Sequence, residues 1–341
     1  MAKRELAQWL DSAGALDAIL RARARNPWPW LTVLTYHRIH PDAMTQPFDQ
    51  GVIDTTPAEF EQQIATLRRY FTLIGLEELR SHLAGGPLPP NPAVLTFDDG
   101  YRDCYDRALP ILLKYGVKAT FFIATSYVSE RRVFWWDRIS YLVHCSTYPR
   151  IEIRYPIHVT LELGAKEQAI QQLLSIIKRW HSLDIESFLT GLAESCGVRW
   201  DAELERSYAD ELVMSWDHVR ALRRAGMEIE SHTRTHRVLQ TVPQHELVGE
   251  LAGSKLDLEE QLGERISSVS YPVGRPITQN PEIRAAVAEA GYELGFSNMN
   301  GVTWTWGRFD PLDLQRMAMG SDVPSAYFRG FLAFPWLAQA R

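Results

Sequence analysis

The sequence is poor in cysteine, and its thiols form no obvious framework. Only Cys104, Cys145 and Cys196 occur in 341 residues, an odd number at wide spacings. Disulfide-stapled domains need an even and denser set, and thiolate zinc sites need closely spaced pairs. We therefore expect buried thiols of a reducing compartment.

Long apolar runs and an excess of positive charge are also missing. Residues 1–26 mix charged and apolar positions, so no signal peptide is expected, and no stretch has the length of a transmembrane helix. Lys and Arg number 36 against 42 Asp and Glu, which leaves no basic footprint for nucleic acid. We expect a cytoplasmic protein, or one peripheral to the inner membrane, that binds no nucleic acid.

Internal repeats and low-complexity tracts are absent, whereas 45% of the residues are hydrophobic, enough for a large core. The apolar spacing in residues 2–25 predicts an amphipathic helix that breaks near Gly14. We expect this helix to pack on the core, and attachment to a membrane surface is the alternative. From residue 94 onward, strand and helix patterns alternate, which predicts a parallel α/β sheet with crossover helices.

Two carboxylates and two imidazoles follow strand-like runs. The segment Thr96–Tyr101 puts Asp98 and Asp99 where a strand ends, and His232 and His236 stand four residues apart after another such run. A solvated turn or a polar helix face would explain either pair alone. Together, at the carboxyl ends of parallel strands, two His and one Asp suit a zinc-type ion with an open coordination position. The remaining carboxylate could act as a base, which predicts metal-assisted hydrolysis.

At these positions the chain resembles the polysaccharide deacetylases of the NodB-homology type, carbohydrate esterase family 4. Thr96–Tyr101 matches the first family motif, T-F-D-D-G, and His232–His236 matches the second, H-[ST]-x-x-H. Ser270–Gly274 resembles the third motif imperfectly. The resemblance extends over about half of the chain, in residues 31–39, 90–125 and 213–320.

The resemblance implies an α/β fold, a distorted (β/α) barrel with an inserted mixed segment. We expect residues 31–341 to form the barrel domain and residues 1–30 to form a helical extension. No family motif falls in residues 126–212, which we interpret as an insertion that shapes the substrate cleft.

The resemblance also implies roles for single residues. Asp98 would be the general base for the attacking water. One divalent ion, with zinc as the first choice, would be held by Asp99, His232 and His236. A backbone N–H near Val273 would help to hold the oxyanion. The residues expected at the oxyanion and the substrate are Tyr271, Pro272, Val273, Gly274 and Arg275.

Two departures from the family pattern leave roles open. The family often has Arg at the start of the third motif, where it steers the base, but this chain has Ser270. Arg275 could replace that Arg, or it could be a structural or surface residue. The family's usual acid is a His in a late Leu-x-His motif, yet no His follows His245. Leu314–Met317 occupies a comparable place without an imidazole.

His37 is the candidate replacement for the acid. Residues 31–39 read as a buried strand, and their Tyr36-His37 pair looks like a segment of poly-N-acetylglucosamine deacetylases, in which the motif order is permuted. The first and last strands of a closed barrel are neighbours, so His37 could reach the site. A strand-end histidine bonded to a carbonyl is the alternative.

These residues predict a metal-dependent hydrolase that removes an N-acetyl or N-formyl group from an amino sugar. The substrate would be a glycan or a lipid-linked or nucleotide-linked saccharide, and a lipid-linked one would bring peripheral contact with a membrane. The alternatives are a catalytically idle carbohydrate-binding protein that keeps the metal site, and an esterase or amidase acting on a non-sugar substrate.

Overall fold

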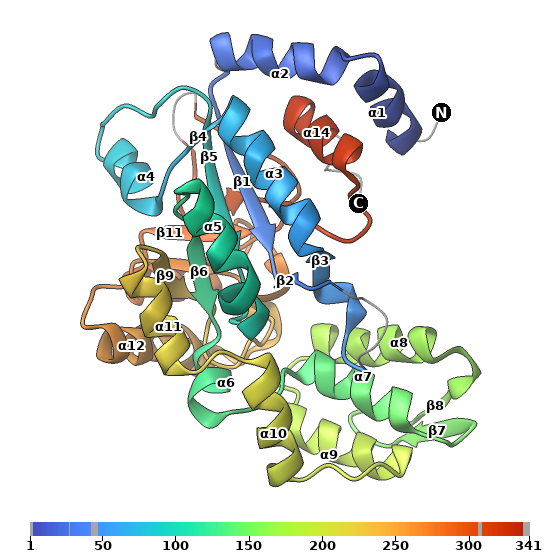
Figure 1. Ribbon diagram of the computed structural model, residues 1–341. Helices are drawn as coiled ribbons and strands as arrows, with labels where there is room; N and C mark the ends of the chain where they lie inside the picture. Colours follow the sequence, from blue (N-terminus) through green and yellow to red (C-terminus); the bar gives the residue numbers. More distant parts are fainter. Residues whose placement is uncertain (1–2, 27, 42–46, 306–308, 337–341) are drawn as a thin grey trace.

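Parallel strands curve into a nearly closed barrel with helices around it (Figure 1). The structure is a computed structural model that describes residues 3–26, 28–41, 47–305 and 309–336. In the order of their pairing, the strands of the wall are β1 (Trp30–Tyr36), β5 (Pro92–Phe97), β6 (Thr120–Ile123), β9 (Glu228–Ser231), β10 (Ser268–Ser270), β11 (Leu294–Ser297), β13 (Leu314–Gln315) and β14 (Met317–Ala318).

The barrel closes through a single short segment. β13 pairs with β11, whereas β14 pairs with β1, and all these pairings are parallel. Arg316 is the residue between the two strands. The first and last strands are therefore neighbours, as the sequence predicted.

The outer helices begin and end where the sequence signals indicated. Thr56 caps α3 with a capping box to Glu59, and Pro57 takes the first helical position. Gly116, with φ 60°, ends α5, and Gly263 ends α12 with φ 69°. The helices along the outside are α3 (Pro57–Tyr70), α4 (Leu76–Leu83), α5 (Leu109–Tyr115), α11 (Trp216–Arg224), α12 (Gln244–Leu262) and α13 (Pro281–Glu289).

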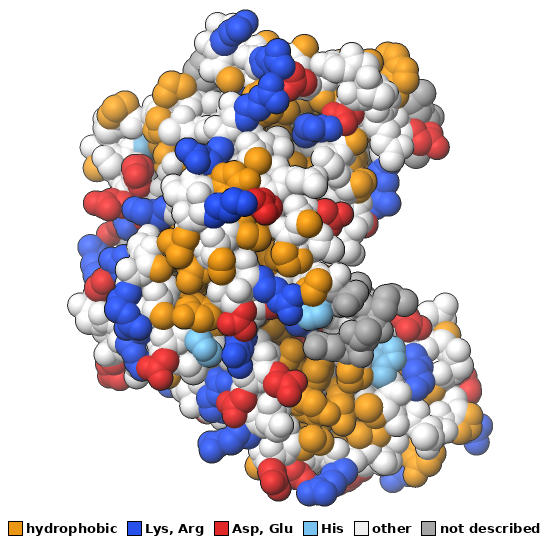
Figure 2. Space-filling model, viewed as in Figure 1, with side chains coloured by type: hydrophobic (Ala, Val, Ile, Leu, Met, Phe, Trp, Pro, Cys, Tyr) orange, Lys and Arg blue, Asp and Glu red, His pale blue; other side chains and the backbone are white. Residues whose placement is uncertain are grey.

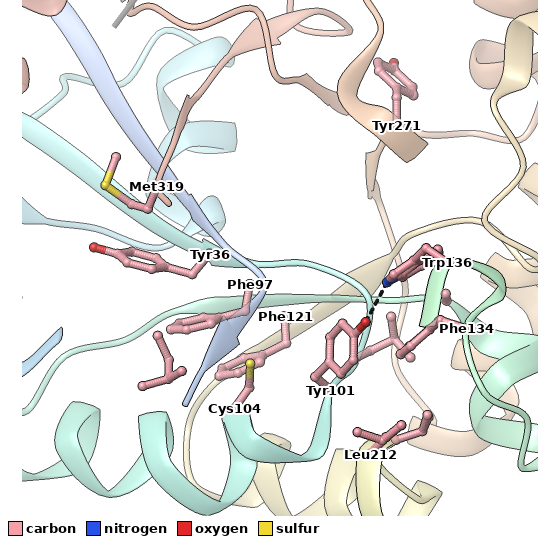
Figure 3. Close-up of a cluster of buried hydrophobic side chains, with 14 of the residues drawn as sticks. Tyr36, Phe97, Tyr101, Cys104, Phe121, Phe134, Trp136, Leu212, Tyr271 and Met319 are labelled. Atoms are coloured by element: carbon pink, nitrogen blue, oxygen red, sulfur yellow. Dashed lines mark hydrogen bonds between the residues drawn. The ribbon is translucent and has the colours of Figure 1, made fainter. Parts of the chain in front are cut away.

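Aromatic side chains fill the space between the wall and these helices (Figure 3). Phe97 stacks on Phe121 with ring centroids 4.8 Å apart, and Tyr36 lies 5.5 Å from Phe97. Phe60 of α3 meets the Tyr36 ring edge-on at 5.2 Å. Burial of such rings is a large apolar contribution, and it fixes the ends of β1 and β5 relative to each other.

The amino end of the barrel is covered by α1 (Lys3–Ser12), α2 (Ala15–Arg25) and α14 (Ser325–Ala333) (Figure 1). The predicted break at Gly14 is confirmed, with φ 71°. Leu16 and Leu20 are buried, as expected for packing on the core, whereas Trp9 is 60% exposed. No helix of the described residues is long and apolar enough to cross a membrane.

The chain between β6 and β9 forms a mostly helical lobe at the opposite end of the barrel (Figure 1). In the space-filling view the outline is hollowed where the barrel meets this lobe (Figure 2). The elements of this lobe are α6 (Thr125–Glu130), α7 (Trp135–Cys145), the hairpin of β7 (Arg150–Ile153) and β8 (Val159–Glu162), α8 (Lys166–Arg179), α9 (Ile185–Cys196) and α10 (Ala202–Leu212). We call residues 126–212 the insertion.

Short strands complete the sheet system near the barrel ends. β2 (Arg38–Ile39) pairs with β3 (Ile53–Thr55), which follows a 3-10 turn at Gln50–Val52. β4 (Thr72–Leu73) pairs with β5, and β12 (Thr303–Trp304) runs antiparallel to β1. The β2–β3 pair holds the chain that leaves β1 at the carboxyl end, beside the insertion (Figure 1).

Candidate active site

The ends of neighbouring strands bring the predicted site residues together. His37 follows β1, Asp98 and Asp99 follow β5, and His232 follows β9. The Asp98 N–H donates to the carbonyl of Tyr36 at 2.8 Å, which ties the end of β5 to the end of β1. His37 therefore stands beside the carboxylates on an adjacent strand, so it does not depend on the closing strand for its position.

Asp99, His232 and His236 converge as a buried cluster. One ligand atom from each lies within 4.8 Å of the others. The Nε2 atoms of His232 and His236 are 3.3 Å and 3.2 Å from Asp99 Oδ1. Among the described residues, no other group of carboxylate, imidazole or thiolate side chains meets in this way.

The protonation pattern of this cluster fits a cation. His232 Nδ1 lies 2.8 Å from the carbonyl of Ser270, so it carries the proton and Nε2 keeps a free lone pair. Burial lowers the pKa of His236, which favours its neutral form. Asp99 Oδ1 is buried and has no hydrogen-bond donor among the described residues. Acceptor atoms facing one another in this way suit a divalent ion.

The backbone around the cluster is in an unusual conformation. Asp99, Thr233, His236 and Val273 all have positive φ angles, between 53° and 74°, which non-glycine residues rarely adopt. Glu250 of α12 accepts the backbone N–H groups of Arg234 and Thr235. Such backbone strain gathers at functional sites, where surrounding contacts maintain it.

Asp98 is held by a partner that sequence reasoning missed. The Arg316 guanidinium donates to both of its carboxylate oxygens, at 2.9 Å and 2.7 Å, and the Ser270 hydroxyl lies 3.0 Å from Oδ2. Burial alone would raise the pKa of Asp98, but the charge and hydrogen bond of Arg316, together with His232 and His37, outweigh burial and hold that pKa below its usual range. The carboxylate is therefore ionised and oriented.

Arg275 does not take the place of the missing motif arginine. Its guanidinium donates to the backbone carbonyl of Lys178 in the insertion at 2.9 Å. The guanidinium beside Asp98 comes instead from Leu314–Met317, the segment that the sequence showed to lack an imidazole.

His37 is paired with Asp54 in the middle of β3, another residue that the sequence did not reveal. The Asp54 carboxylate accepts the backbone N–H of His37 and lies 3.2 Å from Nδ1. Burial disfavours the imidazolium, but Asp54, with smaller contributions from Asp99 and Asp98, outweighs burial and raises the pKa of His37 to about 9. His37 therefore carries a proton at neutral pH.

The predicted catalytic and metal-binding side chains line one cavity of about 230 Å³. The cavity lies between residues that follow the strands, namely His37, Asp98, Asp99, His232 and His236. The insertion and nearby loops add further lining residues, among them Asp49, Trp135, Trp136, Lys178, Val273 and Asn298. Trp136 lies 4.5 Å from the His236 ring, centroid to centroid. Its indole N–H donates to the Tyr101 hydroxyl at 2.6 Å (Figure 3), which links the insertion to the loop of the carboxylates.

The third-motif residues differ in whether they line the cavity. Val273 reaches the cavity, whereas Tyr271 is buried and its hydroxyl donates to the carbonyl of Leu312 at 2.6 Å. Pro272 is buried, and Gly274, with φ 70°, packs so closely on Asn298 that an added Cβ would lie 2.2 Å from the Asn298 Cβ. Of the five, only Val273 lines this cavity.

Fold and site together define a parallel α/β barrel protein with a candidate metal centre at the carboxyl ends of its strands. The family model for polysaccharide deacetylases matches residues 85–295, more than half of the sequence. The chain belongs to the polysaccharide deacetylase family.

Curated relatives and solved structures agree with this membership. The chain is 33% identical over 93 residues to the poly-beta-1,6-N-acetyl-D-glucosamine N-deacetylase of Escherichia coli K12, covering 26% of this chain and 13% of that protein. It is 24% identical over 208 residues to the Bacillus subtilis protein YxkH, named as a polysaccharide deacetylase, covering 61% and 45%. The chain thus spans less than half the length of these relatives.

The fold is shared with solved structures, among them one from Streptococcus pyogenes and one from Ammonifex degensii. The Streptococcus pyogenes deacetylase PplD, in complex with acetate, superimposes with a TM-score of 0.58 at 19% identity, covering 89% of this chain and 98% of that one. IcaB from Ammonifex degensii gives a TM-score of 0.55 at 18% identity, covering 92% and 98%.

Proposed function

We propose that this protein is a metal-dependent hydrolase that removes an N-acetyl or N-formyl group from an amino sugar in a glycan or in a lipid-linked or nucleotide-linked saccharide. Family membership supports a carbohydrate deacetylase in general. The observation that carries the finer proposal is the buried set of Asp98, Asp99, His232 and His236 facing His37 around one cavity. The name of the E. coli relative supports an amino-sugar substrate.

The metal ligands in this proposal are Asp99, His232 and His236. A zinc-type ion bound there would polarise the acyl carbonyl and lower the pKa of a water molecule. The hydrogen bond of His232 Nδ1 to the Ser270 carbonyl orients the His232 ring. The hydrogen bond from the Arg234 N–H to Glu250 holds the loop between the two histidines.

Asp98 and His37 would move the protons. Asp98, kept ionised by Arg316, would take a proton from the water as the water oxygen adds to the acyl carbon. His37, kept protonated by Asp54, would give its proton to the amide nitrogen as the C–N bond breaks. The products would be the free carboxylate and the amino sugar. The backbone at Val273 is our candidate for a donor to the oxyanion.

Metal content and turnover together test these roles. We expect Asp99→Ala or His232→Ala to lose the bound ion, as measured by elemental analysis, with the fold retained. Asp98→Asn should keep the ion and lose turnover by about 10²-fold or more, since a general base contributes that much. The measurement is acetate release from N-acetylated amino sugars.

Four results would contradict parts of the proposal. Equal metal content near zero in wild type and variants, under metal-replete conditions, would remove the metal site. Loss of metal in Asp98→Asn would mean that the two carboxylates have exchanged roles. Faster release of acetate from O-acetyl than from N-acetyl substrates would favour the esterase alternative, and release from neither would favour an idle carbohydrate-binding protein.

A further inference from the structure

The insertion places a cation in the wall of the catalytic cavity. Lys178 lies in the last turn of α8 and lines the same cavity as Asp98 and His232. The family motifs do not include this segment, and the mechanism above gives it no role.

The Lys178 ammonium has little negative charge close to it. Among the described residues, no carboxylate oxygen lies within 4.0 Å of its Nζ. Burial lowers the pKa of Lys178; the more distant Asp49 offsets this only in part, and Arg275 adds to the lowering. Asp49 already accepts the backbone N–H of Gly51 at 2.8 Å. A half-buried cation of this kind is stabilised by any anion that enters the cavity.

Arg275 holds the backbone at Lys178. Its guanidinium donates to the carbonyl of Lys178 at the C-terminal end of α8, where a positive charge is favourable. Arg275 follows the 3-10 turn that carries Val273, so one hydrogen bond ties the third-motif loop to the insertion. The Arg275 charge therefore lies near Lys178, and of the two cations Lys178 is the one that lines the cavity.

We propose that the substrate carries an anionic group, a phosphate or a carboxylate, beside the N-acylated sugar, and that Lys178 binds this group while Arg275 holds Lys178 in place. An ammonium is a compact point charge that suits either anion. The inference rests on the proposed deacetylase function and narrows its substrate class. Lys178 is a specificity-determining residue, and Arg275 is a positioning residue.

Three probes separate the sources of the anion. They are the methyl glycoside of N-acetylglucosamine, which is neutral, N-acetylglucosamine 1-phosphate, and a disaccharide of N-acetylglucosamine with glucuronic acid. Wild type should show a higher kcat/KM on one of the two anionic probes than on the neutral one. Its KM for that probe should rise with ionic strength, because salt screens the attraction.

Lys178→Met should lower kcat/KM on the preferred anionic probe about tenfold more than on the neutral probe, chiefly through KM, as for the loss of one charge-assisted hydrogen bond. Lys178→Arg keeps the charge and should retain most of the preference. Lys114→Met is the matched control, because Lys114 pairs with Glu61 on the outer surface. The anionic probe that shows the effect identifies phosphate or carboxylate as the bound group.

Equal losses on the neutral and anionic probes, or a wild-type preference for the neutral probe, would overturn the inference. If no probe releases acetate, the proposed function fails, and the inference is then tested by binding alone. Calorimetry would measure the affinity of both anionic probes for the metal-loaded wild type and for Lys178→Met. Weakening of about tenfold for either anion would support the inference, and unchanged binding of both would refute it.

Discussion

Asp54 controls the charge of His37 from 17 residues away. A general acid is active only while it holds its proton, so activity that depends on His37 is lost as pH rises through its pKa, which lies near 9. Removal of the Asp54 charge lowers that pKa toward the ordinary value of 6.5. We expect Asp54→Asn to move the alkaline limb of the kcat/KM profile to lower pH.

The pH profile of acetate release measures this shift. Asp106→Asn is a suitable control, because Asp106 pairs with Arg102 on the surface, away from the cavity. An alkaline limb that stays in place in Asp54→Asn would show that His37 is not the acid.

His37 itself offers a second test. His37→Ala should lower turnover on N-acetyl sugars while the metal content stays that of wild type. The loss should be smaller on an activated ester, because its leaving group departs without protonation. Parallel assays on the two substrates, with elemental analysis, check the prediction, and equal losses on both would contradict it.

The motif residues could be predicted because each follows a strand, and strand ends meet at one edge of a parallel sheet. Asp98, Asp99, His232 and His236 accordingly meet around one cavity. Arg316 and Asp54 carry no such local signal. Arg316 reaches Asp98 across 218 residues of sequence, so only the three-dimensional register of the closing strands reveals it.

At the scale of elements, the N-cap of α3 determines how firmly that helix supports β1. The Thr56 hydroxyl accepts the Glu59 N–H, and Phe60 packs on Tyr36 just before His37. We expect Thr56→Ala to lower the free energy of unfolding by about 1 kcal/mol, the usual value of such a cap. Denaturant titration measures the change.

Thr66→Ala, in the exposed part of the same helix, provides the control. It removes a hydroxyl but introduces a better helix former, so the free energy of unfolding should not fall. An equal loss in both variants would mean that the cap has no special contribution.

Helix ends were the most predictable part of the fold, because Gly, Pro and Thr act locally. Gly263 directly follows the last residue of α12 (Gln244–Leu262), and Pro281 is the first residue of α13 (Pro281–Glu289). Elements whose existence depends on distant partners were harder to foresee. The predicted strand over residues 31–39 is divided into β1 and β2, and the two-residue strands β2 and β14 are defined by their pairing with β3 and β1.

At the scale of the whole molecule, Arg316 joins the closure of the barrel to the catalytic site. Arg316→Met would leave the buried Asp98 carboxylate without its partner. We expect the free energy of unfolding to fall by about 3–5 kcal/mol, as for other broken buried ion pairs. Denaturant unfolding of the variant and of wild type measures this loss.

The double variant Arg316→Met with Asp98→Asn isolates the charge. It should regain part of the stability while turnover remains lost, because the carboxylate is then neutral. If the double variant is as unstable as the sum of its two single variants, packing rather than charge holds this part of the barrel.

Because Arg316 lies at the junction between β13 and β14, late in the sequence, it is synthesised well after Asp98. A ribosome adds roughly 5–20 residues per second, so it makes Arg316 roughly 10 to 40 seconds after Asp98, 218 residues earlier. The last of the proposed metal ligands, His236, also precedes Arg316 in the sequence, so only in the final part of that interval does the nascent chain contain the whole proposed ligand set without the guanidinium that orients Asp98. In the proposed mechanism the chain would therefore hold its ligands for the ion before its base is oriented, and hydrolysis would begin only once the wall of the barrel is complete.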